Sequence, residues 1–146
     1  MYRSILVATD CTDTAAVAVE HAAGLAQAVG ATLHVVSVYR EPATVAMTHA
    51  GYGSGSFEPW TAEAYEDRGR QVESVTTRLR DRGLHVIGHV ERGEPAAAIV
   101  SVAHEIDADL IVVGSRGMNG LRRLVGSVPN ALAHAKAFHV LVVRTE

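Results

Sequence analysis

The chain has 146 residues, of which 48% are hydrophobic and 20% charged, and its net charge is −3. This length fits one domain with a sizeable core, and this composition excludes a disordered chain. The acidic balance argues against a nucleic acid partner, and the apolar runs are too short to span a membrane. A single cysteine, and a strand-like run that starts almost at Met1 with no signal peptide before it, predict a cytoplasmic protein.

The first part of the chain predicts a strand, a helix and a second strand. The apolar run Ser4–Thr9 and the β-branched run Thr32–Tyr39 are typical of strands. Between them, Thr12 or Asp13 can cap an alanine-rich helix that continues over Ala15–Val29.

Spacings of three and four residues predict which face of this first helix is apolar. The residues at those spacings are Val17, His21, Gly24, Leu25 and Ala28. Gly30 follows at the position where a glycine commonly ends a helix.

After an irregular, glycine-containing stretch over Arg40–Glu58, helices and strands alternate again. The helices expected there are Trp60–Arg82, Ala96–Ile106 and Ser127–Lys136, and the strands are His85–Glu91, Asp109–Val113 and His139–Arg144. On the first of these helices, Ala64, Val72, Val75 and Leu79 predict an apolar stripe.

The alternation of strands and helices predicts a single α/β domain over residues 1–146. The five strands would form a parallel sheet with helices on both faces, because continuous apolar strands are buried on both sides. In such sheets, ligands bind at the carboxyl ends of the strands, beside the point where the strand order reverses.

A glycine-rich segment follows the fourth expected strand and is the strongest candidate for a binding site. It consists of Gly114–Gly120, followed by Gly126 and Ser127 at the start of the last expected helix. Backbone amides of such a loop can form a nest for anions, and a helix N-terminus favours phosphate. Residues 110–146 also hold five basic side chains and one acidic one. The segment therefore predicts a phosphate site.

Other phosphate and nucleophile motifs do not fit. The sole lysine, Lys136, is far from the position that a Walker A loop requires. The first strand is followed by Asp10–Asp13 without a glycine, which excludes the usual dinucleotide fingerprint. A G-x-S-x-G nucleophile elbow is absent from the sequence.

With Gly114, Gly117, Gly126 and Ser127 after the fourth strand and Asp10 after the first, the chain resembles the universal stress protein family over nearly its whole length. The resemblance implies the ATP-binding branch of that family. It implies a Rossmann-like fold, similar to adenine nucleotide alpha hydrolases, with strand order 3-2-1-4-5. It also implies a homodimer.

The same resemblance implies which residues surround the nucleotide. Asp10 would bind the ribose hydroxyls or the adenine region, and the backbone of Val38 would lie against the adenine edge. The residues implied around the adenosine are Ala8, Thr9, Asp10, Val38, Val113 and Gly114, and those around the phosphates are Ser115, Arg116, Gly117, Gly126, Ser127 and Val128.

The glycine motif departs from the family pattern in length. Eight residues, Met118–Val125, separate its central glycines, where the usual ATP-binding pattern has nine. The sequence therefore predicts adenine nucleotide binding without separating ATP from ADP or AMP. Mg²⁺ or Mn²⁺ would be carried by the phosphates. No dedicated metal site is expected, because His85 and His89 lie about 13 Å apart along one strand.

The expected function is a nucleotide-binding sensor or regulator in stress responses, with no catalytic residue assigned. Two alternatives stay open: a slow ATP hydrolase or phosphotransferase, and a dimeric interaction module that binds no nucleotide. The order implied by the resemblance leaves the apolar strand 139–144 at one edge of the sheet. Because natural proteins cover such edges, a homodimer through this strand is expected.

Overall fold

The computed structural model describes residues 1–39, 58–115 and 138–145, with the side chains of 58–61 left aside. Its strands are β1 (Ser4–Ala8), β2 (Thr32–Tyr39), β3 (Val86–Arg92), β4 (Leu110–Gly114) and β5 (His139–Val143), and its helices are α1 (Asp13–Val29), α3 (Glu58–Asp81) and α4 (Pro95–Glu105). The expected helix Ser127–Lys136 and most of the stretch Arg40–Glu58 lie outside the described residues. Across the described part, no helix is both long and apolar enough to cross a bilayer.

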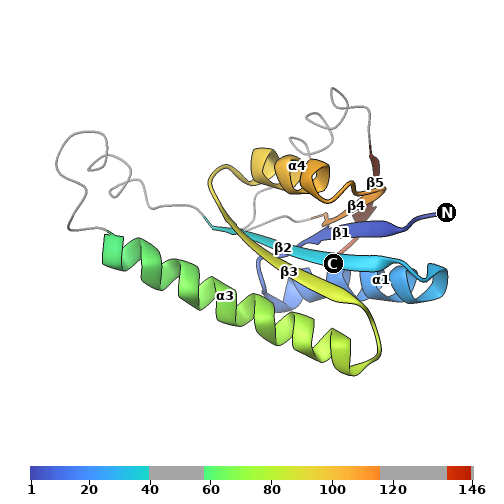
Figure 1. Cartoon of the computed structure of the whole chain (residues 1–146), viewed down its shortest axis with the longest axis horizontal. Coiled ribbons are helices and arrows are strands. Elements are labelled where there is room, and N and C mark those ends of the chain that lie inside the picture. Colours follow the sequence, from blue (N-terminus) through green and yellow to red (C-terminus); the bar gives the residue numbers. More distant parts are fainter. Residues whose placement is uncertain (40–57, 116–137, 146) are drawn as a thin grey trace.

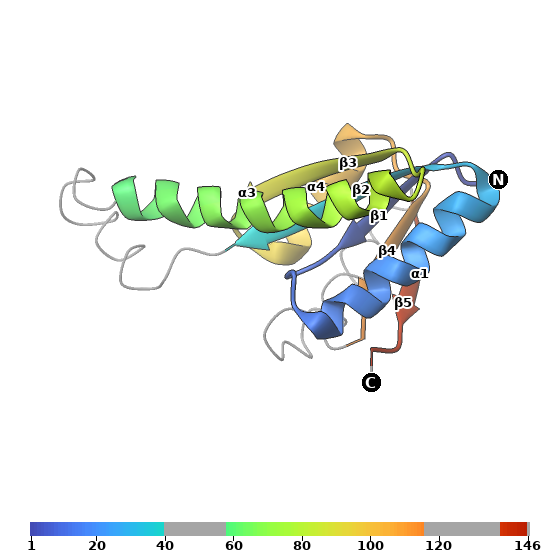
Figure 2. The ribbon, with the colours of Figure 1, turned by 90° about the horizontal axis from the view of Figure 1, so that it is seen from below.

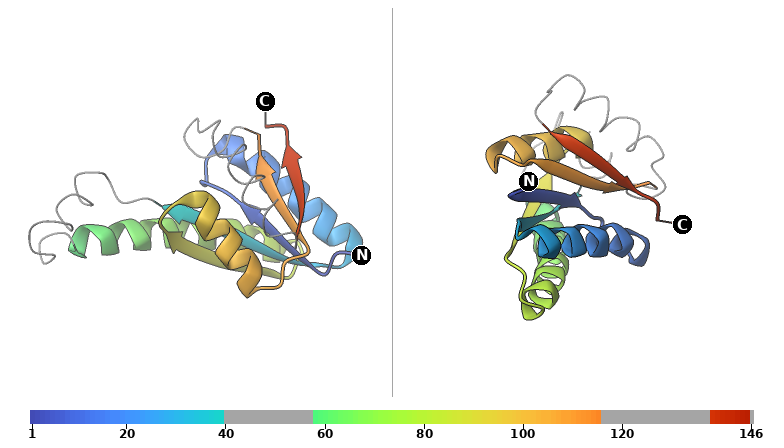
Figure 3. Two further views of the ribbon diagram at one scale, coloured as in Figure 1. Left: turned by 90° about the horizontal axis from the view of Figure 1, so that it is seen from above. Right: turned by 90° about the vertical axis from the view of Figure 1, so that its right-hand side faces the viewer.

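The five strands form one parallel sheet in the order β3-β2-β1-β4-β5, which confirms the expected fold class and strand order. Helices α1 and α3 lie on one face of the sheet and α4 lies on the other (Figures 1 and 3). The edge strands are β3 and β5, so the apolar C-terminal strand lies at the edge as expected. The expected burial of the fourth strand on both faces is also confirmed, since Leu110 to Val113 are at most 3% exposed.

Helix α1 packs on the sheet through alanines, and the face predicted from the sequence is wrong. Its buried residues are Ala18, Val19, Ala22, Ala23 and Ala26. Val17, from the predicted face, is 37% exposed, and His21 is also exposed. Small side chains let the helix approach the strands closely. Of the larger residues on the predicted face, Leu25 packs against the margin of the core, whereas Val17 does not.

Side chains and glycines define the ends of the helices, and both ends of α1 follow the sequence signals. Thr12 caps α1 by accepting a hydrogen bond from the amide of Ala15, and Gly30 ends the helix in the left-handed conformation at φ 72°. At α4, the carboxylate of Glu94 accepts hydrogen bonds from the amides of Ala96 and Ala97. Both helices start directly after strand ends, so they place their N-termini at the carboxyl edge of the sheet.

Helix α3 is long and extends beyond the sheet at its N-terminal end (Figures 1 and 2). Val72 and Leu79, from the predicted stripe, are buried, as is Thr76. Gly88 of β3 lies under this stripe, because a Cβ built on it would stand 2.7 Å from a methyl group of Val72. The helix and the edge strand are therefore in close contact through this glycine.

Candidate functional site

The carboxyl ends of β2, β1 and β4 lie side by side at the point where the strand order reverses. Strand β1 pairs with β2 on one side and with β4 on the other, with Val7 opposite both Val35 and Val112. The chain leaves β1 through α1 toward β2, while β4 lies on the opposite side. This is the position at which doubly wound sheets bind their ligands.

Asp10 follows β1 at this edge, and its carboxylate is oriented by the cap of α1. Oxygen Oδ1 accepts hydrogen bonds from the amide of Thr12 at 3.0 Å and from its hydroxyl at 2.6 Å. Within the described part of the chain, Oδ2 accepts no hydrogen bond. The half-buried side chain thus keeps one carboxylate oxygen for a hydroxyl or amine donor of a ligand.

Cys11 lies at the bend between β1 and α1 in a conformation that favours glycine. Its φ is 65°, and its amide donates to the hydroxyl of Thr9 at 3.0 Å. The thiol lies 4.0 Å from the hydroxyl of Ser37 on β2. Burial raises the pKa of this thiol, against the hydrogen bond to Ser37 and the positive charge of Arg68, which lower it. The raised pKa lowers the fraction of thiolate near pH 7, and the thiolate is the nucleophilic form of a cysteine.

The expected adenosine residues Ala8, Val38 and Val113 lie together, but in the core beneath the edge. They belong to the apolar cluster between the sheet and α4, and they are 9%, 2% and 2% exposed. Thr9 is 3% exposed and its amide donates to the carbonyl of Val36 at 2.9 Å. Because their side chains are buried, these residues can contact a ligand mainly through backbone atoms at the ends of the strands.

Gly114 and Ser115, at the end of β4, contact the chain that follows β5. A Cβ built on Gly114 would stand 2.9 Å from a methyl group of Thr145 and 3.8 Å from the Cβ of Ala18. The amide of Ser115 donates to the carbonyl of Val143 at 2.7 Å, and its hydroxyl accepts from the amide of Thr145 at 3.1 Å. The expected contacts of Ser115 with phosphate therefore compete with Thr145, which the sequence did not indicate.

Arg68 of α3 reaches the same edge and was not predicted from the sequence. Its Nη1 donates to the carbonyl of Asp10 at 3.2 Å and to the hydroxyl of Ser37 at 3.0 Å. A sequence signal existed, because Arg68 lies four residues after Ala64 and four before Val72, within the apolar stripe. A charged residue in that stripe indicates a buried polar partner.

The remaining expected site residues are not described by the structure. Arg116, Gly117, Gly126, Ser127 and Val128 lie outside the described residues. The structure thus brings together the adenosine half of the expected site. Among the residues that it describes, no group of three or more His, Cys, Asp or Glu side chains could hold a metal ion.

A histidine pair lies elsewhere on the sheet, on the α4 side of β2 and β3. The imidazoles of His34 and His89 stack, with their ring centroids 5.2 Å apart and Nδ1 of the first 2.9 Å from Nε2 of the second. Burial, followed by the charges of His89 and His85, lowers the pKa of His34 to about 4. Because the pKa of each ring is lowered, both imidazoles are neutral near pH 7, and in this contact one ring nitrogen donates its N–H to the other.

Comparison with known proteins agrees with this arrangement. The profile of the universal stress protein family matches residues 1–144. The universal stress protein YxiE of Bacillus subtilis is 32% identical over 148 residues, which cover 99% of this chain and 100% of the relative.

Solved structures of similar proteins share the fold. A universal stress protein solved in complex with cAMP is 28% identical, with a TM-score of 0.67 over 99% of this chain and 98% of that one. A member from Burkholderia pseudomallei is 27% identical, with a TM-score of 0.72 over 97% and 96% of the two chains. By the profile, the curated relative and the five-stranded sheet, the chain belongs to the universal stress protein family.

Proposed function

We propose that this protein binds an adenine nucleotide at the carboxyl ends of β1, β2 and β4 and acts as a sensor or regulator in stress responses. The observation that carries the proposal is Asp10 at the switch point, with Oδ1 held by Thr12 and Oδ2 without a hydrogen bond in the described part. A carboxylate in this position suits the two neighbouring hydroxyls of a ribose, which are hydrogen-bond donors.

The relatives and the sequence support the same ligand class. A relative 28% identical to this chain is a universal stress protein solved in complex with cAMP. In the proposed site, the segment from Ser115 to Val128 binds the phosphates through Arg116, the amides around Gly117 and Gly126, and the hydroxyl of Ser127. The phosphates carry Mg²⁺ or Mn²⁺ when one is bound. With one cysteine, the protein suits a reducing compartment, and we place it in the cytoplasm.

Ligand-dependent melting tests the proposal. ATP, ADP, AMP and cAMP are added separately to the purified protein, with GTP as the control for the base. A ligand that binds only the folded state increases the free energy of unfolding and thereby raises the melting temperature. At a ligand concentration one hundred times the Kd, the free energy of unfolding increases by about 2.7 kcal/mol. At least one adenine nucleotide is expected to raise it, and GTP is expected to raise it less.

Variants locate the site. Gly117→Val and Gly126→Val should abolish the shift by filling space that the phosphates need, and Asp10→Ala should reduce it. Asp13→Ala is the matched control, since it removes an exposed carboxylate three positions away in the first turn of α1. Unchanged shifts in Asp10→Ala and in both glycine variants would refute the assignment.

A further inference from the structure

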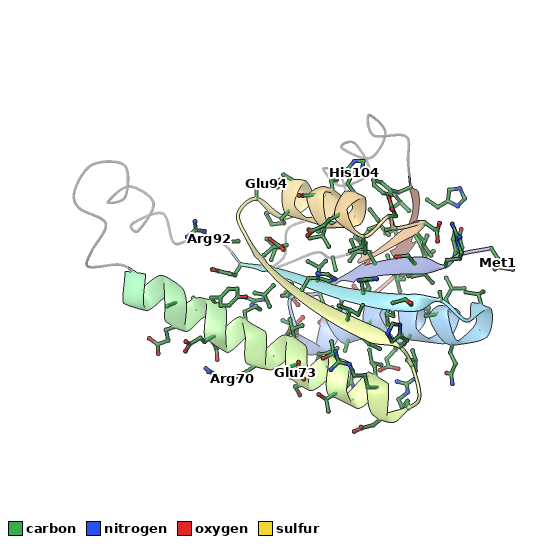
Figure 4. The ribbon with its side chains drawn as sticks, in the orientation of Figure 1. Met1, Arg70, Glu73, Arg92, Glu94 and His104 are labelled. Carbon is green, nitrogen blue, oxygen red and sulfur yellow. The ribbon has the colours of Figure 1, made fainter. Side chains whose placement is uncertain are left out.

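Arg68 occupies an unusual position for an arginine. It lies in the apolar stripe of α3 between Ala64 and Val72, on the side that faces the sheet, and its side chain is half-buried. The neighbouring Arg70 points away from the sheet on the outer side of the helix (Figure 4) and pairs with Asp67 at 3.2 Å. Arginine is rarely withdrawn from water without partners that use its donors.

The partners of Arg68 belong to two strands of the candidate site. Its Nη1 donates to the carbonyl of Asp10, after β1, and to the hydroxyl of Ser37, near the end of β2. Ser37 is 0% exposed, so this hydroxyl has no contact with water. Among the described residues, Arg68 forms no ion pair, and the two oxygens that accept its hydrogen bonds are both uncharged.

These contacts hold a turn that carries backbone strain. Cys11 follows the carbonyl that Arg68 binds, and its φ of 65° places it in the left-handed region. Such a conformation is unfavourable in a residue other than glycine and persists only where neighbouring contacts hold it. Arg68 provides a contact from α3, in addition to the hydrogen bonds within the turn from Thr12 to Asp10 and from Cys11 to Thr9.

We propose that Arg68 is a positioning residue: it fixes the turn from Thr9 to Thr12 against β2 and thereby orients the carboxylate of Asp10 toward the ligand. The claim that Asp10 is oriented toward a ligand rests on the nucleotide site proposed above. Arg68 does not contact the nucleotide in this scheme. It acts through the carbonyl of Asp10, while the carboxylate of the same residue binds the ribose hydroxyls.

The first measurement needs no ligand. Hydrogen exchange of the Cys11 and Thr12 amides reports opening of the turn, because both amides donate within it. In Arg68→Ala, these amides should exchange at least about tenfold faster, because the turn loses the hydrogen bond from a charged donor that holds it closed. In Arg68→Lys, which retains one cationic donor, the effect should be smaller, and Arg70→Ala should match the wild type.

The second measurement uses ATP and 2′,3′-dideoxy-ATP, which lacks both ribose hydroxyls. Arg68→Ala should weaken ATP binding about tenfold and binding of the dideoxy analogue by less than about twofold, because its effect passes through Asp10 to the hydroxyls. A melting curve for each variant shows that the fold is intact.

The outcomes separate this inference from the proposed function. Unchanged exchange at Cys11 and Thr12 in Arg68→Ala overturns the positioning role, whatever ATP does. Equal weakening of ATP and its dideoxy analogue overturns the route through Asp10. A wild-type protein that binds no adenine nucleotide refutes the proposed function, and the exchange rates then decide the positioning role alone.

Discussion

At the scale of single residues, the pair of His34 and His89 links the stability of the protein to pH. Burial and its histidine neighbours hold the pKa of His34 at about 4, and burial also lowers the pKa of His89. The unfolded chain, in which a histidine titrates near pH 6.5, therefore binds protons first as the pH falls. The free energy of unfolding must decrease from about pH 6.5 down to about pH 4, by at most about 1.4 kcal/mol per pH unit for one histidine.

We expect the His34→Leu variant to lose stability less steeply than the wild type between pH 7 and pH 5. In the wild type, the titration of His34 alone should lower the free energy of unfolding at pH 5 by about 2 kcal/mol relative to neutral pH. Urea unfolding at several pH values measures both slopes. His21→Gln, on the exposed side of α1, should retain the wild-type slope. Parallel curves for wild type and His34→Leu would contradict the assignment.

Cys11 gives a second prediction at this scale. Because burial raises the pKa of its thiol, alkylation by iodoacetamide at pH 7.5 should be slower than in the urea-unfolded chain. Saturating ATP should slow it further, since Cys11 lies between Asp10 and α1 at the proposed site. Intact-mass spectrometry follows the single modification. Equal rates with and without ATP would place the nucleotide away from this turn.

At the scale of elements, strands were easier to predict than the faces of helices. The bounds of β2 follow its β-branched run, and those of β4 differ by a single position from the expected ones. The prediction of the buried face of α1 was wrong because alanine occurs all around this helix. Contact with the sheet alone determines which of these alanines are covered. Residues that contact distant elements escape any local pattern: Arg68 meets Asp10 and Ser37 at separations of 58 and 31 positions.

Two glycines on facing elements should respond to alanine in opposite directions. Gly88→Ala places a Cβ 2.7 Å from Val72 and 3.2 Å from Thr76, and should cost about 1–3 kcal/mol of stability. Gly69→Ala on α3 meets nothing within 4 Å, and should add about 0.5–1 kcal/mol by favouring the helix. Thermal unfolding of the two variants measures both changes. Similar stabilities would mean that α3 does not pack on β3 through Gly88.

At the scale of the whole molecule, the sheet ends in an apolar edge. Leu141 and Val142 of β5 are 38% and 42% exposed, and this strand has a neighbour on one side only within the described sheet. The fold class and the strand order were predicted correctly, because alternating elements and a resemblance over the whole chain constrain them. The nucleotide site stays a prediction in both halves, and most of the residues expected around the phosphates lie outside the described part.

We expect a homodimer in which β5 of one protomer pairs with β5 of its partner about a two-fold axis. Val142→Asp should produce monomers, because it places a charge without a partner in the buried contact. Light scattering at micromolar concentration measures the mass of both proteins. A monomeric wild type would contradict the expectation, and a dimer unaffected by Val142→Asp would place the interface elsewhere.

The contact of Thr145 with the end of β4 has a practical consequence for experiments on this protein. Thr145 packs on Gly114 and binds Ser115, so the chain after β5 forms part of the wall beside the proposed site. Met1 is 97% exposed and precedes β1, so it lies at the amino ends of the strands, whereas the proposed site lies at their carboxyl ends. An affinity tag or fluorescent fusion attached beside Thr145 should disturb nucleotide binding, whereas the same tag placed before Met1 should leave it intact.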